Sequence, residues 1–219
     1  MLSGTVQAAP DQARGFDANT VISAAQAQAF LAAGFQFALR YVGRTHMASY
    51  DLTTAEAETL LAAGLALMPV QHVLGGEWMP TGALGTEYGT NVATFCQQIG
   101  FPPGVNVWLD LESVSTQAAA ADVVAYCTSW YTAVSAAGYV PGVYVGWHPG
   151  LTGTQLYDLP FQHYWAAYNV DGVSTPHPRG YQMVQSSGTG SIGGVSTEEY
   201  DVDETRADDT GGTVLWLKA

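Results

Sequence analysis

The sequence predicts an α/β fold, a (β/α)8 TIM-type barrel whose late helices are shortened or missing. Two observations lead to this prediction. Helix-like stretches end at Gly34, Gly64, Gly100 and Gly138, and these glycines are 30, 36 and 38 residues apart, the length of one strand-plus-helix unit. After Gly146 the helical signal fades while strand-like runs continue. Repeated strand–helix units indicate a parallel sheet.

Apolar runs alternate with helix-like stretches along the first two thirds of the chain. The pattern Thr53-x-x-Glu56 predicts a capping box at the start of one helix. A long Ala-rich stretch, Thr116–Ala137, predicts another helix. In chain order we expect a strand at Gly15–Asp17, a helix at Ser23–Ala33, a strand at Phe37–Val42, the helix from Thr53, strands at Leu65–His72 and Val105–Leu111, the Ala-rich helix, and strands at Gly142–Gly146, Tyr164–Ala167, Gln182–Gln185, Tyr200–Val202 and Val214–Leu217.

Two sheet arrangements are compatible with this alternation, a closed barrel and an open doubly wound sheet. An open sheet that binds a nucleotide usually has a Gly-rich turn after its first strand, and Asp17-Ala18-Asn19-Thr20 contains no glycine. The closed barrel is therefore favoured. No Pro/Ser-rich linker or composition break divides the chain, so we expect an N-terminal extension at 1–14 and a single domain at 15–219.

The charge balance excludes several classes of partner. The 219 residues include 6 Lys+Arg and 19 Asp+Glu, for a net charge of −13, and 47% are apolar. A globular chain with so few, scattered cations has no basic stripe for nucleic acid or for an anionic membrane surface. No run approaches 18 apolar residues, and the first residues lack the cationic and apolar regions of a signal peptide. We therefore expect synthesis in the cytoplasm and no membrane insertion.

Neither the cysteines nor the histidines predict a metal site or a cofactor. Cys96 and Cys127 lie in different helix-like segments without CxxC spacing, which leaves two buried thiols or one disulfide as alternatives. The five histidines show no HxH or HxxxH spacing. Only His72, at the end of the third predicted strand, is placed at the barrel mouth, where a ligand contact competes with a structural role.

The segment Asn106–Ser113 carries the strongest chemical signal. Its apolar strand ends in Asp110 and Glu112, and the two-residue period of a strand puts both carboxylates on one face. The carboxyl ends of barrel strands form the active-site mouth. Two carboxylates there suit glycoside hydrolysis, which needs an acid for the leaving oxygen and a second carboxylate as nucleophile, base or stabiliser. The alternative is structural, because such residues also cap the next helix.

Other carboxylates and several aromatic residues are expected near the same mouth. Asp17 ends the first predicted strand, and Asp201 and Asp203 close a late one. Sugar rings stack their C–H faces on aromatic side chains, so carboxylates among Trp and Tyr suit a carbohydrate cleft. Core packing is the alternative for each aromatic residue. The aromatic residues predicted at these strand ends are Tyr41, Tyr144, Trp147, Trp165 and Tyr168.

The order of five short motifs resembles bacterial glycoside-hydrolase-like domains, common in actinobacteria and their phages and distantly similar to the family 25 lysozymes. The resemblance spans about residues 15–205 and implies a TIM-type barrel. The motifs are Gly15-Phe16-Asp17 with Arg40-Tyr41, Val107-Trp108-Leu109-Asp110-Leu111-Glu112, Gly142-Val143-Tyr144-Val145-Gly146-Trp147, Tyr164-Trp165-Ala166-Ala167-Tyr168, and Met183-Val184-Gln185-Ser186-Ser187 followed by Tyr200-Asp201-Val202-Asp203.

The resemblance implies roles for the residues within these motifs. Glu112 would be the general acid, and Asp110 would stabilise the oxocarbenium-like centre or orient the substrate's N-acetyl group. Asp17 and Asp201 would shape the −1 sugar site, and Arg40 and Gln185 are expected to contact substrate. The chain departs from the lysozyme pattern at Asp203, where those enzymes usually have Asn, and at Met183–Ser186, which replaces an aromatic-rich version.

Two functions from different classes follow. The first is a muramidase-like glycosidase acting on peptidoglycan. The second is a non-catalytic wall-binding module, or a structural component of a phage tail or injection device, that keeps the barrel. A chitinase-like hydrolase is a third possibility, but that pattern has a further Asp where this chain has Trp108. Because a net charge of −13 disfavours electrostatic steering to an anionic wall, we expect delivery by lysis, a phage particle or another export partner.

Overall fold

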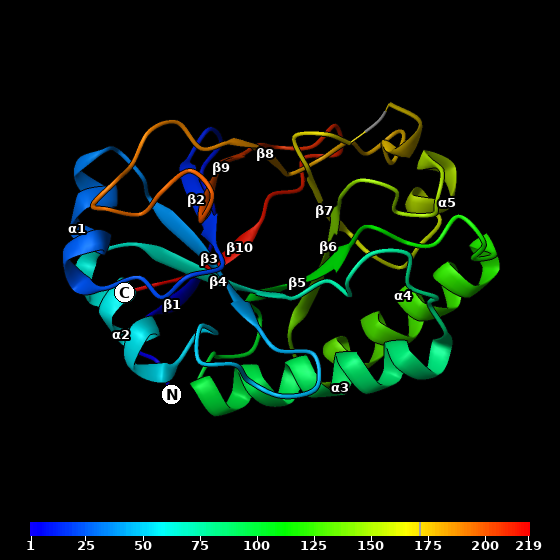
Figure 1. Cartoon of the computed structure of the whole chain (residues 1–219), viewed down its shortest axis with the longest axis horizontal. Coiled ribbons are helices and arrows are strands. Elements are labelled where there is room, and N and C mark those ends of the chain that lie inside the picture. The colour runs from blue at the N-terminus through cyan, green and yellow to red at the C-terminus, as the bar shows by residue number, and fades with distance from the viewer. Residues whose placement is uncertain (171) are drawn as a thin grey trace.

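Eight strands close into a barrel in the computed structural model, which describes residues 1–170 and 172–219 (Figure 1). Each strand pairs with the next along the chain, and the last pairs with the first, so the predicted barrel is confirmed. The barrel strands are β2 (Arg14–Ala18), β3 (Phe37–Val42), β4 (Ala66–Gln71), β5 (Asn106–Leu111), β6 (Val140–Val145), β7 (His163–Ala166), β8 (Met183–Ser187) and β9 (Tyr200–Thr205).

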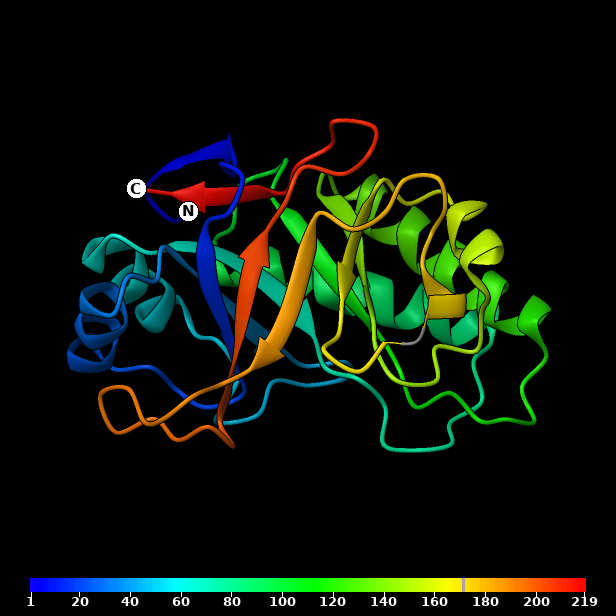
Figure 2. The ribbon, with the colours of Figure 1, turned by 90° about the horizontal axis from the view of Figure 1, so that it is seen from above.

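The eighth strand runs in the opposite direction to the other seven. Strands β2 to β8 are mutually parallel, whereas β9 is antiparallel to both β8 and β2, as Figure 2 shows for the orange and red-orange arrows. A parallel neighbour needs a crossover, usually a helix, and an antiparallel neighbour needs only a loop. Residues 188–199 are rich in Gly, Ser and Thr and form that loop. The carboxyl end of the barrel is therefore at the start of β9.

The helices begin and end largely where the sequence predicts. Ser23 caps the first helix, and Gly34, Gly64, Gly100 and Gly138 all have the positive φ that glycine adopts without steric cost after a helix. The longer helices pack around β2 to β6 (Figure 1). They are α1 (Ala24–Ala32), α2 (Thr54–Ala63), α3 (Gly82–Ile99) and α4 (Ala120–Ala136).

The expected capping box at Thr53 is only half formed. The Thr53 side chain accepts a hydrogen bond from the Glu56 N–H at 3.2 Å. The Glu56 carboxylate does not return to the cap, because it binds Arg40 and the Ile22 N–H instead. A buried guanidinium is a stronger partner for a carboxylate than the exposed backbone of a helix start.

The later connections are short, as the sequence predicts. The helix α5 (Gly153–Tyr157) has only five residues, and the link from β7 to β8 contains the 3-10 turn η1 (Gly172–Ser174). Within residues 172–219 no α-helix follows, so the outer face of β8 and β9 lies open in Figure 2. Among the described residues, no helix is long and apolar enough to cross a membrane.

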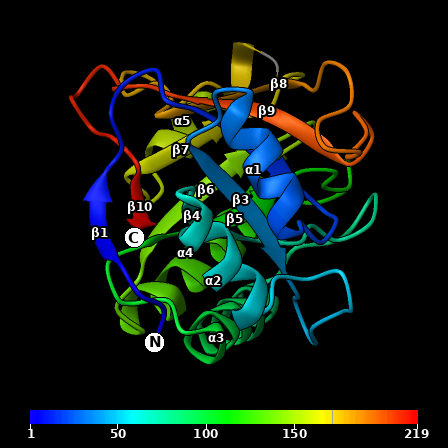
Figure 3. The same ribbon diagram turned by 90° about the vertical axis from the view of Figure 1, so that its left-hand side faces the viewer.

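Two further strands close the amino end of the barrel. β1 (Thr5–Ala8), in the expected N-terminal extension, pairs antiparallel with β10 (Leu215–Lys218) (Figure 3). The carboxyl end of β4 pairs with the middle of β5, and β10 lies beside the start of β4, where Leu217 pairs with Leu67. The Leu215 N–H donates to Asn106 Oδ1 at 2.5 Å. The C-terminal strand β10 thus closes the amino end of the barrel.

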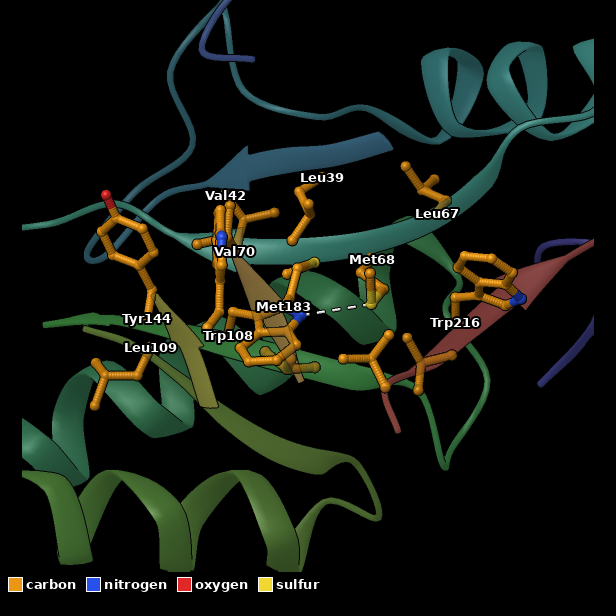
Figure 4. Packing of buried hydrophobic residues seen from close by; sticks show 14 of the residues in the cluster. Leu39, Val42, Leu67, Met68, Val70, Trp108, Leu109, Tyr144, Met183 and Trp216 are labelled. Atoms are coloured by element: carbon orange, nitrogen blue, oxygen red, sulfur yellow. Dashed lines mark hydrogen bonds between the residues drawn. The ribbon is translucent and has the colours of Figure 1, made fainter. Parts of the chain in front are cut away.

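Large side chains fill the interior of the barrel between β10 and the carboxyl end. Trp108 lies at the centre and donates from Nε1 to Met68 Sδ at 3.5 Å (Figure 4). A Cβ at Gly142 would lie 2.5 Å from the Trp108 ring, so only glycine leaves room for it. Cys96 on α3 and Cys127 on α4 are buried free thiols, so of the two alternatives, free thiols or a disulfide, the structure has free thiols. With this filling, open space remains at the carboxyl end.

Candidate active site

A pocket of about 610 Å³ opens at the carboxyl ends of the strands. Six of the residues that the sequence predicts for the site line it. They are Asp17, Tyr41, His72, Asp110, Glu112 and Asp201. They come from five strands or strand ends, so the pocket is assembled by barrel closure rather than by one local motif.

Asp110 and Glu112 reach this pocket at different depths. Asp110 is buried within β5, whereas Glu112 lies just beyond the strand and is half-buried. Glu112 packs against the bare backbone of Gly146, where a Cβ would lie 2.4 Å from Glu112 Oε2. The Glu112 side chain accepts a hydrogen bond from the Trp147 N–H. Gly146 is therefore required for the position of the Glu112 carboxylate.

The backbone around Glu112 is held by the loops that follow β5 and β6. Ser113 and His148 have φ values of +54° and +51°, an uncommon conformation for residues other than glycine. The Ser113 N–H donates to the Trp147 carbonyl at 2.7 Å, and the Val114 N–H donates to the His148 carbonyl at 3.0 Å. Such strain persists only where surrounding contacts hold it. These two loops therefore fix Glu112 in place.

Asp17 is held by a chain of hydrogen bonds across the barrel. Its Oδ2 accepts from Gln185 Nε2 at 2.8 Å, and its Oδ1 accepts from the Tyr41 hydroxyl at 3.2 Å. The Tyr144 hydroxyl donates to Gln185 Oε1 at 2.9 Å. Gln185 and Tyr144 therefore stand behind the pocket and orient Asp17.

Asp201 and Asp203 occupy different depths because β9 is antiparallel. The sequence predicts both at the closing end of a strand, but the mouth lies at the start of β9, so Asp201 lines the pocket and Asp203 lies deeper. Asp203 is fully buried beside the Asp17 carboxyl and the Trp165 indole, and within the described chain its oxygens make no hydrogen bond of good geometry. Burial, followed by the charges of Asp17 and Asp201, raises its pKa well above the usual range.

The other carboxyls of the site also have raised pKa values. Burial raises the pKa of Asp17 to about 6, and the charge of Asp201 adds to the effect. The pKa of Asp110 is raised well above its usual value by burial and then by the charges of Glu112 and Asp17. Burial also raises the pKa of Glu112. The pocket therefore holds protons at pH values where ordinary carboxyls are ionised.

Arg40 lies behind the pocket and does not line it. Its Nε forms an ion pair of 2.7 Å with Glu56 Oε1, and its Nη2 donates to the Tyr50 carbonyl at 2.9 Å. Nη1 donates to the Ala18 carbonyl. These contacts tie β3 to α2, to the loop before α2 and to the end of β2, so Arg40 supports the rim, which differs from the expected substrate contact.

His72 lies at the mouth, as expected, with a partner that sequence reasoning missed. Its Nε2 lies 2.7 Å from Asp51 Oδ1, and its ring stacks on Tyr41 with centroids 4.6 Å apart. The loop from Gly43 to Asp51 supplies this partner and no spacing in the sequence marks it. Among the described residues, no cluster of His, Cys, Asp and Glu is arranged to hold a metal ion.

The predicted aromatic residues divide into exposed and buried groups. Trp147 is 54% exposed beside Glu112, and Tyr168 is 60% exposed over a separate shallow hollow beside β8. Trp165 is only 1% exposed and packs against Tyr144, with ring centroids 4.4 Å apart. Core packing therefore accounts for Trp165, whereas Trp147, whose backbone N–H binds Glu112, keeps an exposed side chain outside the lining of the pocket.

The barrel and its carboxylate-lined pocket define a class, the glycoside hydrolase-like proteins. The chain belongs to the family of Rv2525c-like, glycoside hydrolase-like domains, whose model matches residues 28–205. This match confirms the family resemblance of the sequence motifs. No match was found among curated protein sequences.

Solved structures with the same fold include secreted proteins and lysozymes. The Mycobacterium tuberculosis Tat-secreted protein Rv2525c has a TM-score of 0.66 at 20% identity, covering 89% of this chain and 96% of that one. The bacterial lysozyme from Streptomyces coelicolor has a TM-score of 0.60 at 15% identity, with 92% and 95% covered. The muramidase from Trichobolus zukalii has a TM-score of 0.60 at 16% identity, with 89% and 93% covered. At these identities the likeness establishes the fold alone.

Proposed function

We propose that this protein is a glycoside hydrolase that cleaves peptidoglycan-type glycans of N-acetylated sugars, as a muramidase does. The observation that carries the proposal is the convergence of Asp17, Asp110, Glu112 and Asp201 on one pocket of about 610 Å³. Membership of the glycoside hydrolase-like family and the lysozyme fold support it.

In this proposal Glu112 is the general acid. It is more exposed than Asp110 and can reach the oxygen that leaves with the departing sugar. Its raised pKa keeps a proton available for transfer, and the like charge of Asp110 opposes ionisation of the pair as a whole. The strained loops at Ser113 and His148 hold the acid in place, so reorganisation during the reaction is small.

Asp110, Asp17 and Asp201 surround the sugar that bears the reacting carbon. Asp110 stabilises positive charge at that carbon or orients the substrate's own N-acetyl group. Gln185 orients Asp17 through the 2.8 Å hydrogen bond, with Tyr144 behind it. Tyr41 and His72 line the same pocket, and Trp147 offers a stacking face beside Glu112.

The substrate places the site of action at the bacterial cell wall. The Rv2525c protein of similar fold is Tat-secreted, which makes an export route reasonable for this chain. With a net charge of −13, the protein gains no electrostatic attraction to an anionic wall, so a delivery route such as lysis, a phage particle or a secretion partner is part of the proposal.

The proposal is tested by release of dye from labelled cell walls of several wall types. Wild type releases dye, and Glu112→Gln, which cannot supply a proton, releases it at least ~100-fold more slowly. Glu204→Gln is the matched control, because Glu204 is an exposed carboxylate on the same barrel outside the pocket, and it keeps the wild-type rate.

Equal release by wild type and Glu112→Gln, or no release from any wall, overturns hydrolysis. Binding of glycan without cleavage, unchanged in Glu112→Gln, supports the alternative function, a wall-binding module or a structural component of a phage tail or injection device.

A further inference from the structure

A second, smaller pocket of about 280 Å³ lies beside the main one, and it has a different electrostatic character. The two pockets share Tyr50, His72 and Val73 as a common wall. The smaller pocket is otherwise lined by the loop from Gly43 to Asp51, which carries Arg44 and His46. A substituent that extends past this shared wall from a sugar in the main pocket therefore meets the side pocket.

Arg44 is a cation without an acidic partner. Its Nη1 donates to the His72 carbonyl at 3.3 Å, and no carboxylate in residues 1–170 and 172–219 forms an ion pair with it. Asp51 lines the same pocket, but its Oδ1 is engaged by His72 and its Oδ2 by the Ala48 N–H at 2.7 Å. The other donors of the Arg44 guanidinium are available to a ligand.

The backbone that carries Arg44 is held in advance of binding. Asn91 Nδ2 donates to the Arg44 carbonyl at 2.8 Å, and Gln71 Nε2 donates to the Gly43 carbonyl at 3.3 Å. A Cβ at Gly43 would lie 1.8 Å from the His46 carbonyl oxygen, so the loop turns tightly at a position that only glycine allows. Such anchoring reduces the entropy lost when a ligand binds.

The charges of the two pockets select different parts of a glycan. The main pocket is lined by Asp17, Asp110, Glu112, Asp201, Glu198 and Glu199, with no Lys or Arg on its wall, so it repels an anion and admits a neutral sugar ring. The side pocket, on the other side of the shared wall, offers Arg44, which forms no ion pair among the described residues. A ligand with a neutral ring and one carboxylate on a short arm fits both.

We propose that Arg44 binds a carboxylate on the lactyl arm of muramic acid and so selects peptidoglycan over glycans of N-acetylglucosamine alone. This inference rests on the proposed function, since it names the substrate feature that the same site reads. Muramic acid differs from glucosamine by that arm, which ends either in its own carboxylate or in a stem peptide that bears carboxylates. Arginine pairs with a carboxylate through two parallel hydrogen bonds.

The test measures binding by calorimetry in a Glu112→Gln background, which prevents turnover. Three probes are used: chitotetraose, the peptide-free tetrasaccharide of alternating N-acetylglucosamine and N-acetylmuramic acid, and the disaccharide that carries an L-Ala–D-Glu stem. Arg44→Gln weakens binding of the tetrasaccharide by about 10-fold to 100-fold, because a charge-assisted hydrogen bond is lost, and leaves the affinity for chitotetraose unchanged. Arg44→Lys restores part of the loss.

The matched control is Arg206→Gln, which removes the same charge from an exposed position outside both pockets and leaves all affinities unchanged. Loss confined to the stem-bearing probe assigns the peptide carboxylate, and loss with the peptide-free probe assigns the lactyl carboxylate. Equal weakening of all probes by Arg44→Gln, or no weakening of any, overturns the inference.

The outcomes separate this inference from the proposed function. Wall cleavage by the wild-type protein without any effect of Arg44 leaves hydrolysis standing and removes the role of Arg44. Selective binding through Arg44 without wall cleavage supports the role of Arg44 and overturns hydrolysis. No binding of any probe overturns the inference about Arg44, and the release of dye from walls then decides hydrolysis separately. Thermal unfolding of each variant near the wild-type temperature confirms that it is folded.

Discussion

The two ends of the barrel hold buried carboxylates in opposite ways. At the amino end, Asp208 forms an ion pair of 2.9 Å with Arg179 and accepts from the backbone N–H groups of Gly212 and Thr210 at 2.6 and 2.9 Å. Burial alone would raise the pKa of Asp208, but these hydrogen bonds together lower it. Behind the pocket, Asp203 is also buried, and among the described residues its oxygens make no hydrogen bond of good geometry.

This contrast separates carboxylates that stabilise the fold from those that cost it stability. A paired carboxylate such as Asp208 gains from ionisation, whereas Asp17, Asp110 and Asp203 hold protons because ionisation is opposed by burial and by one another. Such an arrangement is unfavourable for stability and common at functional sites. Asp208 thus stabilises the fold at the amino end, whereas the carboxyls without a cationic partner gather in and behind the pocket, next to the Arg40–Glu56 ion pair of the rim.

The largest expected effect on stability comes from breaking the paired end. Asp208→Ala removes the ion pair with the half-buried Arg179 and leaves the buried Gln182 amide and the N–H groups of Gly212 and Thr210 without this acceptor, so the free energy of unfolding falls by about 3–5 kcal/mol, measured by urea denaturation at pH 7. Asp209→Ala is the control, because Asp209 is the exposed neighbour, and its effect stays within about 0.5 kcal/mol. Similar losses in both variants would show that Asp208 is not a special contact.

A smaller effect of opposite sign is expected at Asp203, behind the pocket. Asp203→Asn raises the free energy of unfolding by about 1–3 kcal/mol at pH 8, because it replaces a buried carboxyl that costs stability with a neutral side chain of the same shape. A raised folded pKa gives stability that is fully present below the unfolded value of 3.8 and lost as the pH rises, so the gain shrinks towards pH 4.

Glu204→Gln serves as the control for Asp203→Asn, since Glu204 is the next residue of β9 and is exposed. Its stability follows that of the wild type at both pH values. If Asp203→Asn is less stable than wild type at pH 8, the Asp203 carboxyl has a favourable role in the fold and the contrast between the two ends fails.

Local patterns predicted most of the barrel. The strand predicted at Phe37–Val42 has those bounds in β3, and the predicted glycine helix ends are all present. The direction of β9 was not predictable, because alternation along Tyr200–Thr205 is the same in either direction. β1 was also missed, since Thr5–Ala8 becomes a strand only by pairing with β10 from the other end of the chain.

The candidate site divides in the same way. Asp110 and Glu112 were found because one strand carries both, and Asp17 and Asp201 because strand ends meet at a mouth. The partners of these residues were missed. The pairing of Arg40 with Glu56 and of His72 with Asp51 depends on how loops fold over the rim, and so does the lack of an acidic partner for Arg44. Residue type and spacing do not encode such contacts between distant segments.

The last prediction compares the two ends of the barrel by the pH dependence of folding stability. His163 lies at the start of β7, at the amino end, and burial followed by the charge of Arg179 lowers its pKa from 6.5 to about 4. The unfolded chain then binds a proton more readily than the folded one between these values, so stability is full above pH 6.5 and falls as the pH falls towards 4. This dependence is opposite to that of Asp203.

His163→Gln therefore gains about 2 kcal/mol relative to wild type when the pH is lowered from 8 to 5, measured by urea denaturation at both values. His46→Gln, at an exposed histidine of the mouth loop, shows no such gain. Equal pH dependence in wild type and His163→Gln would mean that the amino end does not respond to acid through His163. An acid loss removed by His163→Gln, alongside an alkaline loss removed by Asp203→Asn, would locate the two opposing pH responses at opposite ends of one barrel.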